Sequence, residues 1–356
     1  MFVYLVMLVL ISLMFIFQKV TQPEMIKQNT NGNKKITLTA LCVFFVLAFV
    51  AAFRYRVGTD FHSYFKTETW AGKFVEGDFS DPGFTLFAKI ASWLFGGKDG
   101  AVTILSAIVT VALFIFTIAK HSESFTMSVF LFVFIGCFTG MFNGVRQYLA
   151  TGILFAGFHY VVNKKLIKWL IVVLIASTVH ITAILMFFVY FICNLKCDWK
   201  LILLYFILAV VLLFAYEPLF DLIGNLKQEE IDTSYEYMNS SVNIFRILVQ
   251  CAPIVLFLFV DRSKLNSDKE ARFLFNICLF NGALAIAAMN SPYLARFWIY
   301  TSCFQVLMYP KVLNKISGND KIIFTIIIIA CYVVFWAYEI MNSPALSTFR
   351  WIFNYL

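Results

Sequence analysis

Long apolar runs, separated by short polar segments, dominate this chain of 356 residues. A helix needs about 20 apolar residues to cross the roughly 30 Å hydrocarbon core of a bilayer. The pattern therefore predicts an all-α, polytopic helical membrane protein with about ten spans. The expected spans are residues 2–18, 36–53, 101–119, 125–142, 144–162, 201–216, 243–260, 273–289, 294–308 and 322–338.

Two further apolar segments do not fit a single upright span. Residues 83–95 are too few to cross the bilayer and carry Lys89 in their middle. Residues 166–193 would form a helix about 42 Å long, which exceeds the bilayer core. This second segment holds Ser177, Thr178 and His180 near its centre. We expect 83–95 to be an interfacial or re-entrant helix that does not cross, and 166–193 to be a broken hairpin that returns to its starting side.

The distribution of basic residues gives an orientation, because lysine and arginine collect in cytoplasmic loops. Four lysines, Lys19, Lys27, Lys34 and Lys35, follow the first run, so the N-terminus is expected outside. Residues 1–20 have no basic start and no small-residue cleavage site, so we interpret them as a retained first span. With two non-crossing segments, both termini and the loops 54–100 and 217–243 come out external. We expect one transmembrane domain over 1–356, without an internal repeat.

Composition agrees with the membrane class. The chain is 61% hydrophobic, 18% aromatic and 13% charged, with a mean hydropathy of +0.83. A soluble domain has about 25% charged residues, which excludes a globular protein with a single anchor. The net charge of +8 is then a property of cytoplasmic loops, and we do not expect nucleic-acid binding. Cys193 and Cys197 have no second ligand pair nearby, so no metal site is expected.

Polar residues follow the second run directly. Arg54, Arg56, Asp60, His62 and Tyr64 lie within eleven residues. Charge kept at a membrane boundary often serves a site. Two cations, a carboxylate and an imidazole suit a ligand that carries phosphate and hydroxyl groups. The alternative is a juxtamembrane anchor whose arginines bind lipid phosphates.

A second polar cluster, Asn143, Arg146 and Gln147, lies at the junction of two predicted spans. An arginine at a helix start adds its charge to the positive end of the helix dipole, which favours an anion. Its planar fork can bind a phosphate bidentately, and Gln147 can hydrogen-bond sugar hydroxyls. The alternative is a turn in which Asn143 caps the helix and Arg146 extends towards lipid head groups.

Three isolated residues complete the candidates. His180 is the only histidine deep in an apolar segment, and an imidazole with its ordinary pKa near 6.5 can accept a proton from an attacking hydroxyl. The alternative is a buried histidine that bonds a backbone carbonyl. Arg296 opens a span at the predicted outer face, either in the same site or in an interfacial belt, and Arg246 is a weaker candidate. The sequence has no nucleotide-binding loop, HExxH, GxSxG or DxD motif, so an external site would need a substrate activated on a lipid.

Four motifs occur in a fixed order along most of the chain. They are Arg54-x-x-Val57-Gly58-Thr59-Asp60-x-x-x-Tyr64, Asp81-Pro82-Gly83-Phe84, Asn143-x-x-Arg146-Gln147-x-x-Ala150 and Ala176-x-x-x-His180. Together they resemble the EpsG family, Wzy-type polymerases of exopolysaccharide and O-antigen repeat units. The chain departs from the pattern at Asp81, where a glutamate ahead of Gly-Phe is expected. The acidic member of the site is therefore open among Asp60, Asp78 and Asp81.

The resemblance implies a GT-C-like glycosyltransferase in the bacterial cytoplasmic membrane, active on its outer face. It would move a growing glycan from undecaprenyl diphosphate onto a lipid-linked repeat unit of an exopolysaccharide, capsule or O-antigen. Lipid-linked donor and acceptor, membrane lipid and a chain-length regulator protein are the implied partners, with no cofactor. Arg54, Arg56, Tyr64, Asn143, Arg146, Gln147 and Arg296 would bind the substrate, and His180 or Asp60 would be the base.

Two other classes stay open at this stage. A lipid-linked oligosaccharide flippase would also place cations in a membrane cavity, but on both sides or along a central path. A membrane O-acyltransferase would use a buried histidine such as His180, reached from cytoplasmic acyl-CoA. The predicted external position of the arginines favours the polymerase.

Overall fold

The computed structural model describes residues 1–21, 36–77, 81–227, 242–289, 291–316 and 318–354. Asp78, one of the three candidate acids, lies outside the described residues. The described residues form helices and no sheet, apart from a single bridge between Arg54 and Trp351. The protein is therefore an all-α membrane protein, as the hydropathy pattern predicts.

Helices long and apolar enough to cross a bilayer include, in the described part of the chain, α1 (Phe2–Thr21), α7 (Ala101–His121), α17 (Lys269–Ala287) and α21 (Asn319–Met341). Shorter apolar helices are α3 (Leu38–Ala52), α8 (Phe125–Phe134), α12 (Leu166–Val179), η1 (Ile181–Phe188) with α13 (Val189–Ile192), the first part of α14 (Trp199–Lys227) and α15 (Ile244–Phe257). The remaining elements are α4 (Phe61–Phe65), α5 (Thr67–Glu76), α6 (Pro82–Leu94), α9 (Cys137–Gly140), α10 (Val145–Gly157), α11 (His159–Val162), α16 (Arg262–Ser267), α18 (Pro292–Ala295), η2 (Arg296–Trp298), α19 (Ile299–Ser302), α20 (Gln305–Leu313), α22 (Pro344–Ser347) and η3 (Ile352–Asn354).

Some predicted spans are divided in the structure. The run 125–142 breaks between α8 and α9 at Gly136, whose φ of 89° is incompatible with a continuous right-handed helix. The run 144–162 divides into α10 and α11, and the run 294–308 divides into several short helices. Each piece is shorter than a full bilayer crossing, so the count of ten spans stays a prediction.

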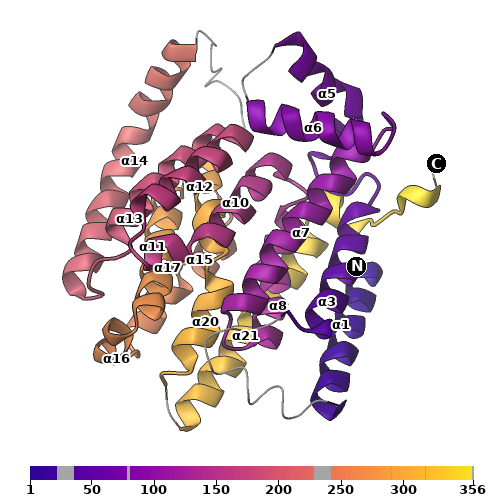
Figure 1. Ribbon diagram of the computed structural model, residues 1–356. Helices are drawn as coiled ribbons and strands as arrows, with labels where there is room; N and C mark the ends of the chain where they lie inside the picture. The colour runs from indigo at the N-terminus through magenta and orange to yellow at the C-terminus, as the bar shows by residue number, and fades with distance from the viewer. Residues whose placement is uncertain (22–35, 78–80, 228–241, 290, 317, 355–356) are drawn as a thin grey trace.

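The helices form an elongated bundle with a cap at one end. Figure 1 shows α1 and α3 side by side at one edge of the bundle, α14 at the opposite edge, and α5 and α6 across one end. Helix α6 has only 13 residues and packs on the end of α12, where a Cβ at Gly83 would collide with Thr178. The expected non-crossing helix at 83–95 is therefore the end cap α6.

The overlong apolar segment is a hairpin, as predicted. Helix α12 ends at Val179, and His180 takes an extended conformation (φ −153°, ψ 113°) before η1 turns back. The Trp169 indole N–H donates to the Met186 carbonyl at 3.2 Å, which pairs the two arms. The Asn194 amide then reaches the Val161 carbonyl at 3.1 Å, next to the start of the segment.

The C-terminal part of the chain bonds both to Met1 and to the segment that carries Arg54 and Asp60. The Met1 amine donates to the Ser347 carbonyl at 3.0 Å. The Tyr55 N–H donates to the Arg350 backbone carbonyl at 2.8 Å, and the Gly58 N–H donates to the Ala345 backbone carbonyl at 2.9 Å. Met1, the 344–352 segment and the first polar cluster thus lie together at one end of the bundle, the capped end; which side of the membrane this end faces stays a prediction.

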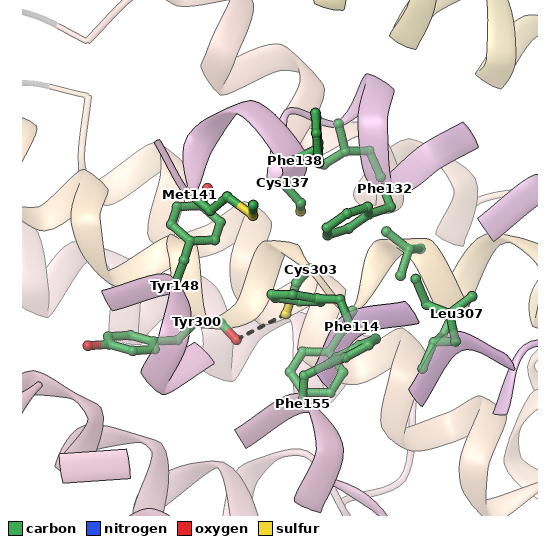
Figure 2. Packing of buried hydrophobic residues seen from close by; sticks show 14 of the residues in the cluster. Phe114, Phe132, Cys137, Phe138, Met141, Tyr148, Phe155, Tyr300, Cys303 and Leu307 are labelled. Carbon is green, nitrogen blue, oxygen red and sulfur yellow. Dashed lines mark hydrogen bonds between the residues drawn. The ribbon is translucent and has the colours of Figure 1, made fainter. Parts of the chain in front are cut away.

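Aromatic side chains hold the helices behind this end together (Figure 2). The ring of Phe114 on α7 lies 5.0 Å from Phe132 on α8 and 5.2 Å from Phe155 on α10. Phe155 in turn contacts the ring of Phe304, with centroids 5.2 Å apart. Helices in lipid associate through such packing, because moving an apolar side chain from lipid into a helix interface yields little hydrophobic free energy. The packing positions α10, whose first turn carries Arg146.

Candidate functional site

A polar cavity of about 530 Å³ opens beneath the capped end. Its walls come from segments far apart in the sequence: the Asp60 segment, α5, α9 and α10, the hairpin tip, α15, η2 and α21. The polar and aromatic side chains among its lining residues include Asp60, Tyr64, Trp70, Asn143, Arg146, Gln147, His180, Arg246, Gln250, Arg296, Trp298, Trp336 and Glu339.

Arg146, in the first turn of α10, is held from three sides. Its Nε donates to the Tyr64 hydroxyl at 2.9 Å, and its Nη1 donates to the Asp81 carboxylate. The guanidinium lies over the Trp70 ring, 4.7 Å from the ring centre. Its side chain remains 27% exposed, so the cation is oriented but still reaches the cavity.

The partners of Arg146 form a small folded unit at the bundle end. The Tyr64 ring on α4 stacks on Trp70 of α5, with centroids 5.2 Å apart and an interplanar angle of 14°. Phe84 of α6 meets both rings edge-on. Asp81 immediately precedes α6, and its side chain is only 8% exposed. Asp81 is therefore the acid that pairs with Arg146, which the sequence pattern left open.

Asp60 is a second acid, and it lines the cavity itself. The Asn143 side-chain oxygen accepts from the Thr59 N–H at 2.8 Å, which fixes the segment beside α10. Burial raises the pKa of the Asp60 carboxyl above that of an ordinary aspartate, although Thr59, Arg296, Arg146 and the Val145 backbone N–H oppose the shift. Asp60 thus lies among two arginines at the positive end of α10.

Gly58 allows this segment to pass close to α9 and α10. It takes a φ of +93°, and a Cβ at this position would overlap the backbone carbonyl of Phe142. Only glycine adopts this conformation without strain and without that overlap. The glycine of the first motif is therefore a requirement of the close approach between the two motif segments.

Arg54 does not take the place expected from the sequence. It is 2% exposed, and it is not among the side chains that line the polar cavity in the described part of the chain. Its Nε donates to the Val57 carbonyl at 3.2 Å and its Nη1 to Ala51, while its guanidinium lies 4.4 Å from the Phe142 ring centre. The end of α3 leaves backbone carbonyls without helical partners, and Arg54 satisfies one of them. The structure therefore places Arg54 in the packing behind the cavity and gives it a structural role there, while its expected contact with substrate stays an untested prediction.

Arg56 is likewise outside the cavity wall. Its side chain is exposed and lies 5.5 Å from the ring centre of its neighbour Tyr55. Its φ of 52° is unusual for a residue other than glycine. Arg56 is thus exposed and is not among the described residues that line the cavity.

Gln147 and His180 also line the cavity. The Gln147 side-chain amide donates to the Arg296 carbonyl at 2.6 Å, which fixes η2 beside α10. His180 is the tip of the hairpin and lines the same cavity as Arg146, Arg296 and Asp60. The structure therefore brings together Asp60, Tyr64, Asn143, Arg146, Gln147, His180 and Arg296, seven of the nine residues predicted for the site.

A second arginine–carboxylate pair lines the cavity. Arg246 on α15 binds Glu339 on α21, with its Nε 3.0 Å from each carboxylate oxygen and its Nη2 at 2.7 Å. Arg246 was a weaker candidate in the sequence, and Glu339 was missed. The only available signal for Glu339 was an acidic residue just beyond a long apolar run.

A hydrogen-bonded network of uncharged side chains lies next to this pair. Gln250 lines the cavity, and its side-chain oxygen accepts from Asn281 at 2.7 Å and from Gln305 at 2.8 Å. The Asn281 oxygen accepts from the Thr301 hydroxyl at 2.7 Å. These residues were not predicted, because each is a single polar residue within an apolar run. Their mutual bonds satisfy polar groups that lipid cannot.

The arrangement suits a ligand with concentrated negative charge and many hydroxyl groups. Arg146 and Arg296 both attract the Asp60 carboxylate, Trp298 lines the cavity, and amides from Asn143, Gln147 and Gln250 supply donors and acceptors. A model of the EpsG family matches residues 37–355, which include all of these groups. The chain belongs to the EpsG family.

Membership of the EpsG family indicates a polymerase of polysaccharide biosynthesis, of a glycosyltransferase type. No curated protein and no solved structure matches the chain. The site of this EpsG-family protein therefore has to be understood from its own geometry.

Proposed function

We propose that this EpsG-family protein polymerises oligosaccharide repeat units linked to undecaprenyl diphosphate. The observation that carries the proposal is the arginine of the second motif. Arg146 faces the polar cavity while Asp81, Tyr64 and Trp70 fix its orientation. A guanidinium fork held in this way matches a diphosphate leaving group better than a freely rotating ammonium group does.

The reaction breaks the bond between the anomeric carbon of the donor glycan and its diphosphate oxygen. A new bond joins that carbon to a hydroxyl oxygen of the acceptor repeat unit, and the acceptor proton passes to a base. Negative charge develops on the departing diphosphate, where Arg146 and Arg296 neutralise it. Preorganised groups of this kind supply the largest catalytic effect in many enzymes because they need no reorganisation during the reaction.

Asp60 and His180 are the two candidates for the base, since both line the cavity that holds Arg146. Burial raises the pKa of Asp60, which makes its carboxylate a stronger base than an exposed aspartate. His180 lies at the hairpin tip and reaches the cavity from another wall. The proposed function holds with either residue as the base.

The proposed side of action is the outer face of the bacterial cytoplasmic membrane. The capped end carries the cavity, while lysines cluster at the opposite end of the bundle. Lys311 lies 2.8 Å from Glu123, just after the end of α7, and Lys315 lies 3.0 Å from Asp268, just before α17. Basic residues favour the cytoplasm, which supports the capped end as external.

Purified protein in liposomes with an undecaprenyl-diphosphate-linked repeat unit tests the proposal. Wild-type protein should convert single units into longer glycans and release undecaprenyl diphosphate in equal number to the bonds formed. Movement of the lipid-linked unit across the bilayer without lengthening would identify a flippase instead. Acyl transfer from acyl-CoA without lengthening would identify an acyltransferase.

A further inference from the structure

A second hollow, the apolar groove, lies between α15 and α21. It has a volume of about 770 Å³ and is lined almost wholly by hydrocarbon side chains. Leu248 on α15 and Ile327 on α21 line it and are 58% and 51% exposed. Ala252 and Ala330 also line it, and their small side chains leave space between the two helices.

The apolar groove adjoins the polar cavity. Phe335 lines both hollows. The same two helices contribute to each: α15 places Arg246 and Gln250 in the cavity, and α21 places Glu339 there. Leu248 and Val249 of the groove lie within one helical turn of Arg246. Along α15 and α21, the charged wall of the polar cavity therefore continues directly into the apolar groove.

We propose that the apolar groove binds the polyprenyl chain of one lipid diphosphate substrate. Its diphosphate then lies at Arg246 and its sugars lie in the polar cavity. This inference rests on the proposed polymerase function and adds the route by which one substrate enters, laterally from the bilayer between α15 and α21.

The cavity has features that match such a molecule and not an ordinary membrane lipid. A phospholipid would fill the groove but would place no oligosaccharide against Gln250 and the tryptophans. Polymerisation requires two lipid-linked molecules at once, and two arginines that line the cavity are each paired with a carboxylate, Arg146 with Asp81 behind the wall and Arg246 with Glu339. The groove adjoins the wall that holds the second pair, so it serves one of the two molecules.

Two tryptophan variants on neighbouring positions of α21 test the groove. Ile327→Trp fills it. Ile326→Trp is the matched control, since Ile326 is 62% exposed and is not among the described residues that line the groove. The KM of each is measured with repeat units linked to undecaprenyl diphosphate and to the much shorter farnesyl diphosphate.

Ile327→Trp should raise the KM for the undecaprenyl substrate about tenfold, the effect of losing roughly two buried methylene contacts. The KM for the farnesyl substrate should change by less than about twofold. Ile326→Trp should match the wild type with both. An equal KM for Ile327→Trp and Ile326→Trp, or an equal rise with both substrates, would overturn the groove assignment.

A binding measurement separates failure of this inference from failure of the proposed function. If wild-type protein lengthens no glycan, the polymerase proposal fails. Binding of undecaprenyl diphosphate alone then tests whether the apolar groove holds a polyprenyl chain. Wild type should bind it about tenfold more tightly than Ile327→Trp and than the second groove variant, Ala252→Phe. Equal affinity of all three proteins for undecaprenyl diphosphate would overturn the groove assignment. Displacement of bound undecaprenyl diphosphate by phosphatidylglycerol vesicles to the same extent as by unlabelled undecaprenyl diphosphate would show an ordinary lipid-binding surface.

Discussion

The guanidinium of Arg146 lies 4.7 Å from the centre of the Trp70 ring. The two residues come from different elements: Trp70 from α5 in the end cap and Arg146 from the start of α10. The ring face attracts the cation without neutralising its charge, whereas Asp81 offsets that charge and Tyr64 fixes its direction. The result is an oriented arginine that can still bind an anion.

Arg146→Lys should lose at least about 100-fold in polymer formation while the protein folds normally. A lysine keeps the charge but loses the fork and the flat stacking surface on Trp70, equivalent to about 3 kcal/mol of transition-state stabilisation. Glycan length on a gel measures the loss. Arg56→Lys is the control, since Arg56 is exposed and outside the cavity, and it should polymerise like the wild type. Normal polymer from Arg146→Lys would remove the diphosphate role.

Arg54→Lys should give a different phenotype. Arg54 is buried and donates to Val57 and Ala51, so a lysine leaves a buried carbonyl without a partner, at about 1–3 kcal/mol. We expect less folded protein in detergent and a lower melting temperature, with the KM of the remaining protein unchanged. A raised KM in a protein of normal stability would return Arg54 to the substrate site.

Gly58→Ala should disrupt the approach of the first motif to the second. The new Cβ would meet the Phe142 carbonyl in addition to the strain of a positive φ. Gly96→Ala is the matched control, because Gly96 also has a positive φ but has nothing within 4 Å of its Cβ position. The control should lower the free energy of unfolding by about 1 kcal/mol. Gly58→Ala should lower it further and reduce polymerisation, as thermal unfolding and the liposome assay would report. Equal effects would contradict the close packing.

The pH dependence of kcat/KM distinguishes the two candidate bases. A base works only when deprotonated, and burial raises the pKa of Asp60 above the ordinary value of about 3.9. If Asp60 is the base, wild-type activity is present at higher pH and is lost as the pH falls through this raised pKa. Asp60→Asn should then abolish turnover while undecaprenyl diphosphate still binds. His180→Gln should still lose kcat/KM as the pH falls, over the same pH range as the wild type. The reverse pattern would assign the base to His180. Near-normal turnover in both variants would exclude both residues.

Cysteine labelling tests the orientation of the bundle. Glu68 on α5 is exposed at the capped end, and the Lys264 side chain on α16 is 61% exposed. In a Cys331→Ser background, which removes an exposed native thiol, a membrane-impermeant reagent should label Glu68→Cys in intact cells and leave Lys264→Cys unlabelled. Permeabilised cells should label both. The opposite pattern in intact cells would place the cavity on the cytoplasmic side.

Local patterns were enough to predict the all-α membrane class and the two irregular segments. The length of an apolar run against the bilayer thickness is a local property, so 83–95 was too short to cross and 166–193 was too long. The same length mismatch placed His180 at a break, and the structure has it at the hairpin tip. Arg146, Gln147 and Asn143 were predicted from their position at a helix start, which is also local.

Only the tertiary structure decided which charged groups reach the cavity. Arg54 and Arg146 are both arginines beside an apolar run. Backbone carbonyls at and just after the end of α3 bind Arg54, whereas Arg146 remains partly exposed to the cavity. Glu339 joined the site because α21 packs beside α15. A sequence records how polar a segment is, whereas the direction of each side chain depends on which distant carbonyl, ring or carboxylate the packed helices bring within hydrogen-bonding distance.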